Sequence, residues 1–157
     1  MLRRHTWKTG VILSGLAALV VVGVAGAQMK VGSGDPVADR QRLMKLNGAS
    51  LVDARGKVQT GNIEAIAVNA ETIAINASHI PTLFPKGSLT DKSNAKPEIW
   101  EKWAEFESAA KNLQTMAEKL RDTARAKDAQ AVEAMTKDFF RQACDTCHKP
   151  FRVPPKS

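Results

Sequence analysis

Along most of the chain, apolar side chains recur every three or four residues, which is the spacing of one face of a helix. After residue 27 no segment alternates between apolar and polar positions for long, so the pattern predicts no β-strand. The clearest stripe begins just after Pro97, a residue that helices accept at their first position. Its members are Trp100, Trp103, Phe106, Ala110, Leu113, Ala117, Leu120 and Ala124. About 30 residues in this register predict one helix of roughly 45 Å.

Two further helices are predicted before this one. The first opens at Asp35, a favoured N-cap residue, has Pro36 in its first turn and should run to about Gly56. The second follows residues 61–62 and should stop near His79, because a proline comes soon after it. Its stripe consists of Ile63, Ile66, Ala70, Ile73 and Ala77.

The last predicted helix is capped by Asp128 and leads directly into Cys144. Its apolar face carries Val132, Met135, Phe139 and Ala143. The connections between the four helices are short at 57–61 and 126–128 and long at 80–96, where prolines and glycines cluster. Four helices joined in this way favour an all-α fold, an antiparallel four-helix bundle with the aromatic side chains in its core.

Residues 1–27 have the pattern of a targeting segment. They begin with three basic side chains and no acid, carry no charge from Gly10 on, and end in Ala25-Gly26-Ala27, the small-x-small pattern that signal peptidase reads. We therefore predict a signal peptide cleaved before Gln28. The mature domain then covers residues 28–157 and lies in a bacterial periplasm, without stable membrane insertion. An uncleaved anchor helix is the alternative, because 18 uncharged residues approach the length of a membrane span.

The formal net charge of +7 does not indicate a nucleic-acid partner. Arg3, Arg4 and Lys8 belong to the predicted signal peptide, and without them the net charge is +4, with acidic and basic residues interleaved. Aromatic residues, at 5%, are too few to suggest a surface on which single-stranded bases stack. We find no paired carboxylates, nucleophile triad or phosphate-binding loop, so we predict that the protein is not an enzyme.

Two cysteines among 157 residues are too few for a disulfide framework, but their spacing indicates a specific chemical use. Cys144, Cys147 and His148 form the motif C-x-x-C-H, the attachment signal of c-type haem. On a helix, steps of three and four residues turn by about 300° and 400°, so the three side chains share one face. The thiols can then add to the two vinyl groups of one porphyrin, with the imidazole held below the iron as an axial ligand. The motif predicts one covalently bound haem c, and its iron, per chain.

Three other uses of the cysteines fit the rest of the chain less well. A thioredoxin-like redox pair is expected within a βαβ unit, and no strand is predicted. A structural zinc site needs four ligands, and His79 is the one obvious supplement in the mature chain. Because His79 lies at a helix end beside Pro81, a surface or capping role suits it better. A plain disulfide is the third alternative.

Only a short segment follows His148, so the haem is expected on the last helix of the bundle. Residues 40–45 (RQRLMK), 83–88 (LFPKGS), 95–100 (AKPEIW) and 144–152 (CDTCHKPFR) look like matching segments of one family. Through them the whole mature chain resembles the cytochrome c′ family, the class II c-type cytochromes, including their low-spin, methionine-ligated relatives. The resemblance implies a periplasmic carrier that exchanges single electrons with redox partner proteins. It also implies a homodimer as one form of assembly.

The resemblance makes one position on the first helix decisive. In high-spin members of the family an apolar residue there blocks the sixth coordination position of the iron, and such proteins bind carbon monoxide and nitric oxide. In the low-spin relatives a methionine from the same place ligates the iron. Met44 occupies that position here. Ligation by Met44 implies electron transfer, whereas a Met44 that only packs on the porphyrin implies the alternative function, a high-spin, gas-binding cytochrome c′.

Four more residues are implied near the haem. Arg40 and Gln41 resemble the family's pair at the haem edge, where a guanidinium or an amide can bond a propionate. The alternative for this pair is an exposed position on the helix surface. Phe84 is implied at the border of the pocket, and Arg152 resembles a basic residue of the proximal side. Pro150 departs from the simple pattern, since a proline there is expected to interrupt the helix and turn Arg152 away.

Overall fold

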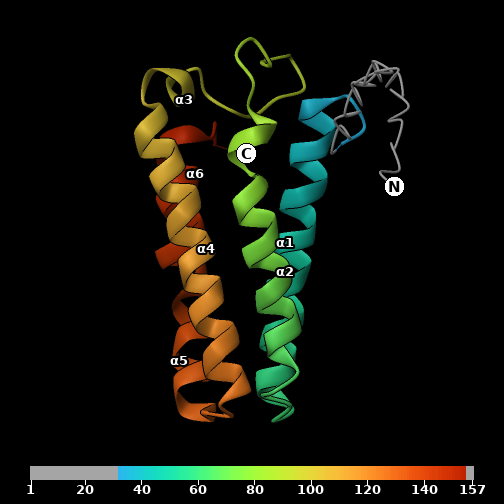
Figure 1. Cartoon of the computed structure of the whole chain (residues 1–157), viewed down its shortest axis with the longest axis vertical. Coiled ribbons are helices and arrows are strands. Elements are labelled where there is room, and N and C mark those ends of the chain that lie inside the picture. The colour runs from blue at the N-terminus through green and yellow to red at the C-terminus, as the bar shows by residue number, and fades with distance from the viewer. Residues whose placement is uncertain (1–31, 155–157) are drawn as a thin grey trace, which may run out of the picture.

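The predicted antiparallel four-helix bundle is confirmed by the computed structural model of the chain, which describes residues 32–154 (Figure 1). Its four rods are α1 (Pro36–Gln59), α2 (Ile66–His79), α4 (Trp103–Arg125) and a last rod built from α5 (Ala129–Phe139), the π-helical turn η2 (Phe140–Cys144) and α6 (Asp145–Phe151). A 3-10 turn, η1 (Pro81–Leu83), and the short α3 (Glu98–Glu101) flank the long connection. The predicted signal peptide at 1–27 lies outside the described residues.

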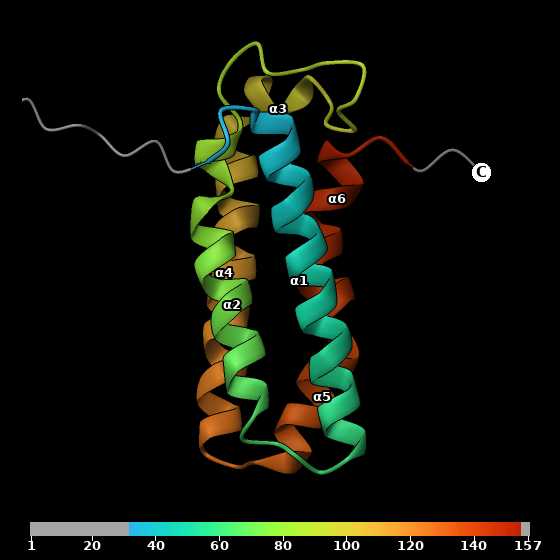
Figure 2. The same ribbon diagram turned by 90° about the vertical axis from the view of Figure 1, so that its right-hand side faces the viewer.

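The long connection marks one end of the bundle, called the loop end below, and the opposite end is called the closed end (Figure 2). At the loop end α1 starts as predicted: the Asp35 carboxylate accepts hydrogen bonds from the backbone N–H groups of Val37 (2.9 Å) and Ala38 (3.1 Å). At the closed end α1 runs three residues beyond the expected Gly56, to Gln59. Gly61 then adopts a φ of +71°, a conformation that glycine accepts at little cost and that lets the chain turn back into α2.

The third helix is not continuous, and this part of the prediction is wrong. Its first turn, α3, is separated from α4 by Lys102, which has a φ of −117° and a ψ of 46°. The periodic stripe hides this break because Trp100 and Trp103 flank it with the spacing of an unbroken helix. A tertiary contact decides the geometry: the indole N–H of Trp100 donates to the carbonyl oxygen of Phe84 at 2.9 Å and ties α3 to the long connection.

The last rod also departs from a single regular helix. Between α5 and α6 the backbone widens into a π-helical turn, a feature that sequence periodicity does not reveal and that often occurs at functional sites. Asn112 of α4 donates to the carbonyl oxygen of Gln142 within this turn at 2.9 Å. The expected interruption at Pro150 is absent, since α6 continues to Phe151. Only Phe151 follows Pro150 in α6, so the proline stands at the end of the helix and interrupts no further turn.

The close approach of α2 to α4 rests on small side chains. Ala70, Ala117 and Ala124 are fully buried, so the two helices pack together with little between them. Leu120 and Val132 fill the remaining space at the closed end and are also fully buried. Within residues 32–154, no helix is both long enough and apolar enough to span a bilayer.

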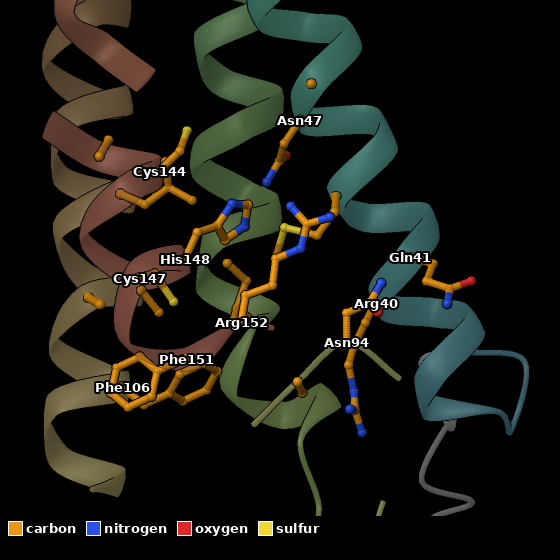
Figure 3. Close-up of a pocket in the computed structure, with 18 of the residues that line it drawn as sticks. Arg40, Gln41, Asn47, Asn94, Phe106, Cys144, Cys147, His148, Phe151 and Arg152 are labelled. Carbon is orange, nitrogen blue, oxygen red and sulfur yellow. The ribbon is translucent and has the colours of Figure 1, made fainter. Parts of the chain in front are cut away.

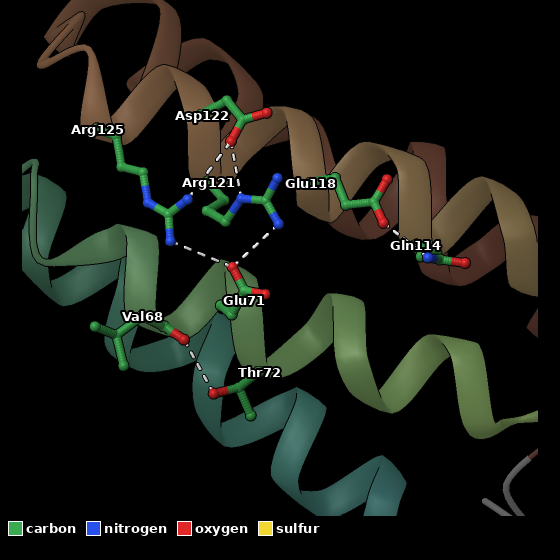
Figure 4. A network of polar contacts seen from close by, with 8 residues as sticks. All are labelled: Val68, Glu71, Thr72, Gln114, Glu118, Arg121, Asp122 and Arg125. Atoms are coloured by element: carbon green, nitrogen blue, oxygen red, sulfur yellow. Dashed lines mark hydrogen bonds and ion pairs between the residues drawn. The ribbon is translucent and has the colours of Figure 1, made fainter. Parts of the chain in front are cut away.

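Charged side chains cover the same helix pair on its outer side (Figure 4). The Glu71 carboxylate of α2 accepts from the guanidinium of Arg121 at 3.1 Å and of Arg125 at 3.5 Å, both from α4. Arg121 also donates to Asp122 at 2.8 Å, and its hydrogen bonds to Asp122 and Glu71 raise its pKa further above the ordinary range. The α2–α4 pair is therefore joined by small apolar contacts inside and by ion pairs outside.

Candidate functional site

Near the loop end the four rods enclose a cavity of about 540 Å³. All the site residues that the sequence predicts line this one cavity: Arg40, Gln41, Met44, Phe84, Cys144, Cys147, His148 and Arg152. They come from α1, the long connection and the last rod, segments that are far apart in the sequence. The fold therefore brings the C-x-x-C-H motif and the first-helix residues to a common site.

The motif residues project into the cavity from the end of η2, which holds Cys144, and from α6, which holds Cys147 and His148 (Figure 3). Cys144 and Cys147 are free thiols, so the alternative of a disulfide between them finds no support. Burial raises the pKa of each thiol to about 11. Burial lowers the pKa of His148, and the positive charge of Arg152 lowers it further. At neutral pH the site thus presents two protonated thiols and an uncharged imidazole whose free nitrogen can bind a metal.

Arg40 of α1 is buried, with 6% of its surface exposed, so the alternative of an exposed Arg40 is wrong. Its Nε donates to the carbonyl oxygen of Leu83 at 2.7 Å, and its terminal nitrogens donate to the backbone carbonyl and hydroxyl of Ser88 and to the hydroxyl of Ser93. The guanidinium also lies 4.2 Å from the ring centre of Phe84. Arg40 therefore organises the long connection over the cavity, a role that its position in the sequence does not reveal.

Gln41 reaches the same connection but stays exposed. Its amide nitrogen donates to the carbonyl oxygen of Lys92 at 3.0 Å. Together with Arg40, it fastens the start of α1 to residues 83–93 by side-chain hydrogen bonds.

Arg152 does not turn away from the site, contrary to the expectation based on Pro150. Its backbone N–H donates to the carbonyl oxygen of His148 at 3.0 Å, and its side chain extends into the cavity beside His148 (Figure 3). An isolated antiparallel bridge to Ala95 and a hydrogen bond from Val153 N–H to the carbonyl oxygen of Asn94 (2.8 Å) hold the chain after α6. These backbone contacts therefore hold the end of the last rod against the long connection.

Aromatic rings form the loop-end floor of the cavity. Phe84 meets Phe106 with ring centres 4.7 Å apart, and Phe106 meets Phe151 with ring centres 5.5 Å apart, both in edge-to-face geometry. The three rings are buried and come from the connection, α4 and α6. Phe84 lines the cavity, and the three packed rings form an apolar wall on its loop-end side.

Comparison with known proteins identifies the group to which these features belong. The sequence model of a family described as Cytochrome C′ matches residues 35–152. The chain belongs to the cytochrome c′ family. It is 33% identical over 121 residues to cytochrome c-556 of Agrobacterium tumefaciens (strain II Chrys), which covers 74% of this chain and 96% of that protein.

Two solved cytochromes c′ share the fold. One is a nitric oxide complex of a mutant from Alcaligenes xylosoxidans, with a TM-score of 0.67, 24% identity and coverage of 76% of this chain and 94% of that one. The other is described as having an unusual ligand-controlled dimer dissociation, with a TM-score of 0.69, 23% identity and coverage of 76% and 95%. For the chain described in this structure, membership of the family means that its cofactor is a covalently bound haem c. Its function is that of a c-type electron-transfer or gas-binding haem protein.

The cavity fits a haem by its own chemistry. Its lining is mainly apolar, as a porphyrin requires, and two thiols and an uncharged imidazole project from the last rod. The cationic side chains of Arg40 and Arg152 lie at the loop end, where carboxylates of a bound group would be stabilised. Within residues 32–154 no group of three or more His, Cys, Asp or Glu side chains is arranged to hold a bare metal ion, so a zinc site gains no support.

Sequence reasoning missed the polar residues Lys45, Asn47, Ser93 and Asn94 of the site, of which Asn47 is the most buried. It lies three residues after Met44 on α1, lines the same cavity and is 9% exposed. Its Oδ1 accepts a hydrogen bond from Nδ2 of Asn76 on α2 at 2.8 Å, while its own Nδ2 is buried without a partner. An available signal was a polar side chain, Asn47, at helical spacing between two apolar ones, Met44 and Leu51.

Proposed function

We propose that this cytochrome is a one-electron carrier of the bacterial periplasm in which Cys144 and Cys147 hold the haem and His148 and Met44 ligate its iron. The observation that carries the proposal is the placement of the last two residues. His148 enters the cavity from α6, whereas Met44 enters it from α1, on the other side. When bound, a haem c supplies an iron that takes up and releases one electron.

The protein residues have separate tasks in this proposal. Cys144 and Cys147, which line the same cavity, provide the sulfur atoms of the two thioether bonds. His148 offers a neutral imidazole because burial disfavours its protonated form. The thioether of Met44 would favour the reduced iron and would exclude other ligands from it. The aromatic floor and the buried Arg40 cover part of the cavity at the loop end.

The alternative is a gas-binding cytochrome in which Met44 packs beside the haem without ligating it. Two observations favour it as the second candidate. A cytochrome c′ of the same fold was solved as a nitric oxide complex. The side chain of Met44 is also only partly buried and makes no hydrogen bond, so nothing but packing fixes it before haem is bound.

A visible spectrum of the ferric holoprotein tests the choice. Ligation by Met44 gives a low-spin spectrum with the weak red band of methionine sulfur on ferric iron, and Met44→Ala abolishes that band and lets the ferrous protein bind carbon monoxide. Met135→Ala is the matched control, because Met135 lies on α5 and does not line the cavity. A high-spin wild-type spectrum that responds to carbon monoxide supports the gas-binding alternative instead.

Location and assembly complete the proposal. The pattern of residues 1–27 supports export with cleavage before Gln28, and the mass of the protein recovered from periplasm tests it.

We further propose that the protein is not an enzyme and that it forms a homodimer. Exposed apolar side chains on α1 and α2 support the dimer: Leu46, Val52, Val68 and Ile75. Light scattering of the holoprotein measures its mass in solution, and a monomer at every concentration contradicts the dimer.

A further inference from the structure

Asn47 is the one side chain of the cavity that offers a buried hydrogen-bond donor with no acceptor. The carboxamide is 9% exposed, and its Oδ1 is already held by Asn76 at 2.8 Å. Because one end of the carboxamide is fixed, the other end, Nδ2, is directed into the cavity (Figure 3). A buried donor without a partner costs about 1–3 kcal/mol, so the site is built for an acceptor that the protein itself does not supply.

The position of Asn47 limits what this acceptor can be. Arg40 and Lys45 precede Asn47 on α1 and therefore lie nearer the loop end, and Arg152 is clasped to the connection there. The positive charges of these three side chains are suited to bind the carboxylates of a haem. The neutral amide of Asn47 is therefore expected to donate to a different acceptor. Asn47 follows Met44 by three residues, so the two side chains lie on one face of α1 a single turn apart. The acceptor of Asn47 is then an atom on the Met44 side of the haem.

We propose that Asn47 is the distal hydrogen-bond donor of this cytochrome: its Nδ2–H donates to the atom that coordinates the iron on the side of α1. This inference rests on the haem site proposed above, with His148 on one face of the haem and α1 on the other. The chemistry of the acceptor is a lone pair on an iron-bound atom. It is the sulfur of Met44 when Met44 ligates the iron, and an atom of an exogenous ligand when it does not.

The test uses carbon monoxide as a probe of the distal side. In the Met44→Ala holoprotein, a donor near the bound oxygen strengthens back-donation from iron and lowers the C–O stretching frequency. Adding Asn47→Leu, which keeps the size but removes the donor, is expected to shift that frequency upward and to speed carbon monoxide dissociation about two- to tenfold, the effect of one neutral hydrogen bond. Infrared spectroscopy and stopped-flow displacement measure the two effects.

A second measurement distinguishes the two acceptors. If Met44 ligates the iron, Asn47→Leu in the otherwise wild-type protein shifts the red methionine–iron band and lowers the reduction potential, because the sulfur loses a hydrogen bond that withdraws its electrons. If the wild type binds carbon monoxide directly, the proposed ligation by Met44 fails. The Asn47→Leu comparison is then made in the wild type, where the same upward C–O shift is expected.

Two variants keep the result interpretable. Asn69→Leu is the matched control, since Asn69 is equally buried on α2 but bonds to Asp53 and Lys57 outside the cavity, and this variant should leave the C–O frequency unchanged. Asn76→Ala removes the anchor of Asn47 without removing the donor, so it should broaden the C–O band even if Asn47→Leu assembles poorly. An unchanged C–O frequency and dissociation rate in Asn47→Leu, together with an unchanged C–O band width in Asn76→Ala, overturns the proposal.

Discussion

The two ends of the bundle use the same kind of helix stripe for opposite purposes. At the closed end Ala117, Leu120 and Val132 are fully buried, and none of them lines the cavity. At the loop end the same rods enclose a cavity of about 540 Å³. The contrast is sharpest on α4, where Ala110 lines the cavity and Ala117, two turns further along the same face, packs against α2.

This contrast shows that a small residue on a helix stripe can have either of two structural roles in a bundle. An alanine brings two helices together when the neighbouring helix can move in, and it leaves room when that helix is held away. At the loop end the connection is fixed by Arg40, and the last rod is widened by the π-helical turn. Arg40 and residues of the π-helical turn line the cavity together with Ala110. The stripe alone therefore does not tell which of its alanines faces a neighbouring helix and which faces the cavity.

The largest expected effect comes from removing the two thiols. The double variant Cys144→Ser and Cys147→Ser should lose covalent haem completely, because serine hydroxyls do not form the thioether bonds, while the closed end keeps its helices. Haem staining of a denaturing gel and the intact mass measure the loss, and circular dichroism measures the helix content. Thr146→Val, between the two cysteines, is the control and should retain haem. Covalent haem in the double variant would mean that other side chains attach it.

The next largest effect is expected at the closed end. Leu120→Ala removes a fully buried side chain and should lower the free energy of unfolding by about 2–5 kcal/mol, the range for such cavities. The visible spectrum of the holoprotein should not change, because Leu120 does not line the haem cavity. Denaturant titration followed by circular dichroism gives the free energy. Leu89→Ala, at an exposed position of the connection, is the control with little expected effect. A changed spectrum in Leu120→Ala would contradict the separation of the two ends.

Placing one larger side chain at each end tests the two roles of alanine directly. Ala117→Leu overpacks the α2–α4 contact and should destabilise the protein by about 1–3 kcal/mol without altering the haem spectrum. Ala110→Leu extends into the cavity and should instead reduce the fraction of protein that carries haem. The ratio of haem absorbance to protein concentration measures the second effect. Equal haem content in the two variants would contradict the assignment of Ala110 to the cavity.

The sequence predicts the helices and the chemistry of the site better than it predicts the connections. Periodicity and caps locate α1 and α5, because each reports on a local face or a local hydrogen bond. Periodicity also finds α2, but the predicted stripe starts at Ile63, whereas the helix begins at Ile66 and has no side-chain cap. The motif at Cys144 and the resemblance at Met44 identify residues that the fold brings to one cavity. These inferences need only spacing along one helix, or a match to a family.

What the sequence does not predict depends on contacts between distant segments. The break at Lys102 accompanies a hydrogen bond from Trp100 to Phe84, sixteen residues away. The buried position of Arg40 depends on Leu83, which is 43 residues further along the chain. The unpaired amide of Asn47 is recognised only once Asn76 is known to hold its other end. Helical periodicity contains no information about any of these partners.

The smallest expected effects come from the two helix caps, one at each end of the molecule. Asp35 at the loop end accepts from two backbone N–H groups of α1, whereas Asp128 at the closed end accepts from one, that of Ala131 at 3.0 Å. Each change to alanine should lower the free energy of unfolding by about 0.5–2 kcal/mol, with the larger loss at Asp35. Asparagine at either position keeps an oxygen acceptor and should restore most of the stability. Thermal and denaturant unfolding of the six proteins, including a surface control such as Ser108→Ala, measures the order. A larger loss at Asp128 than at Asp35 would mean that the closed end depends on its cap more than the number of hydrogen bonds indicates.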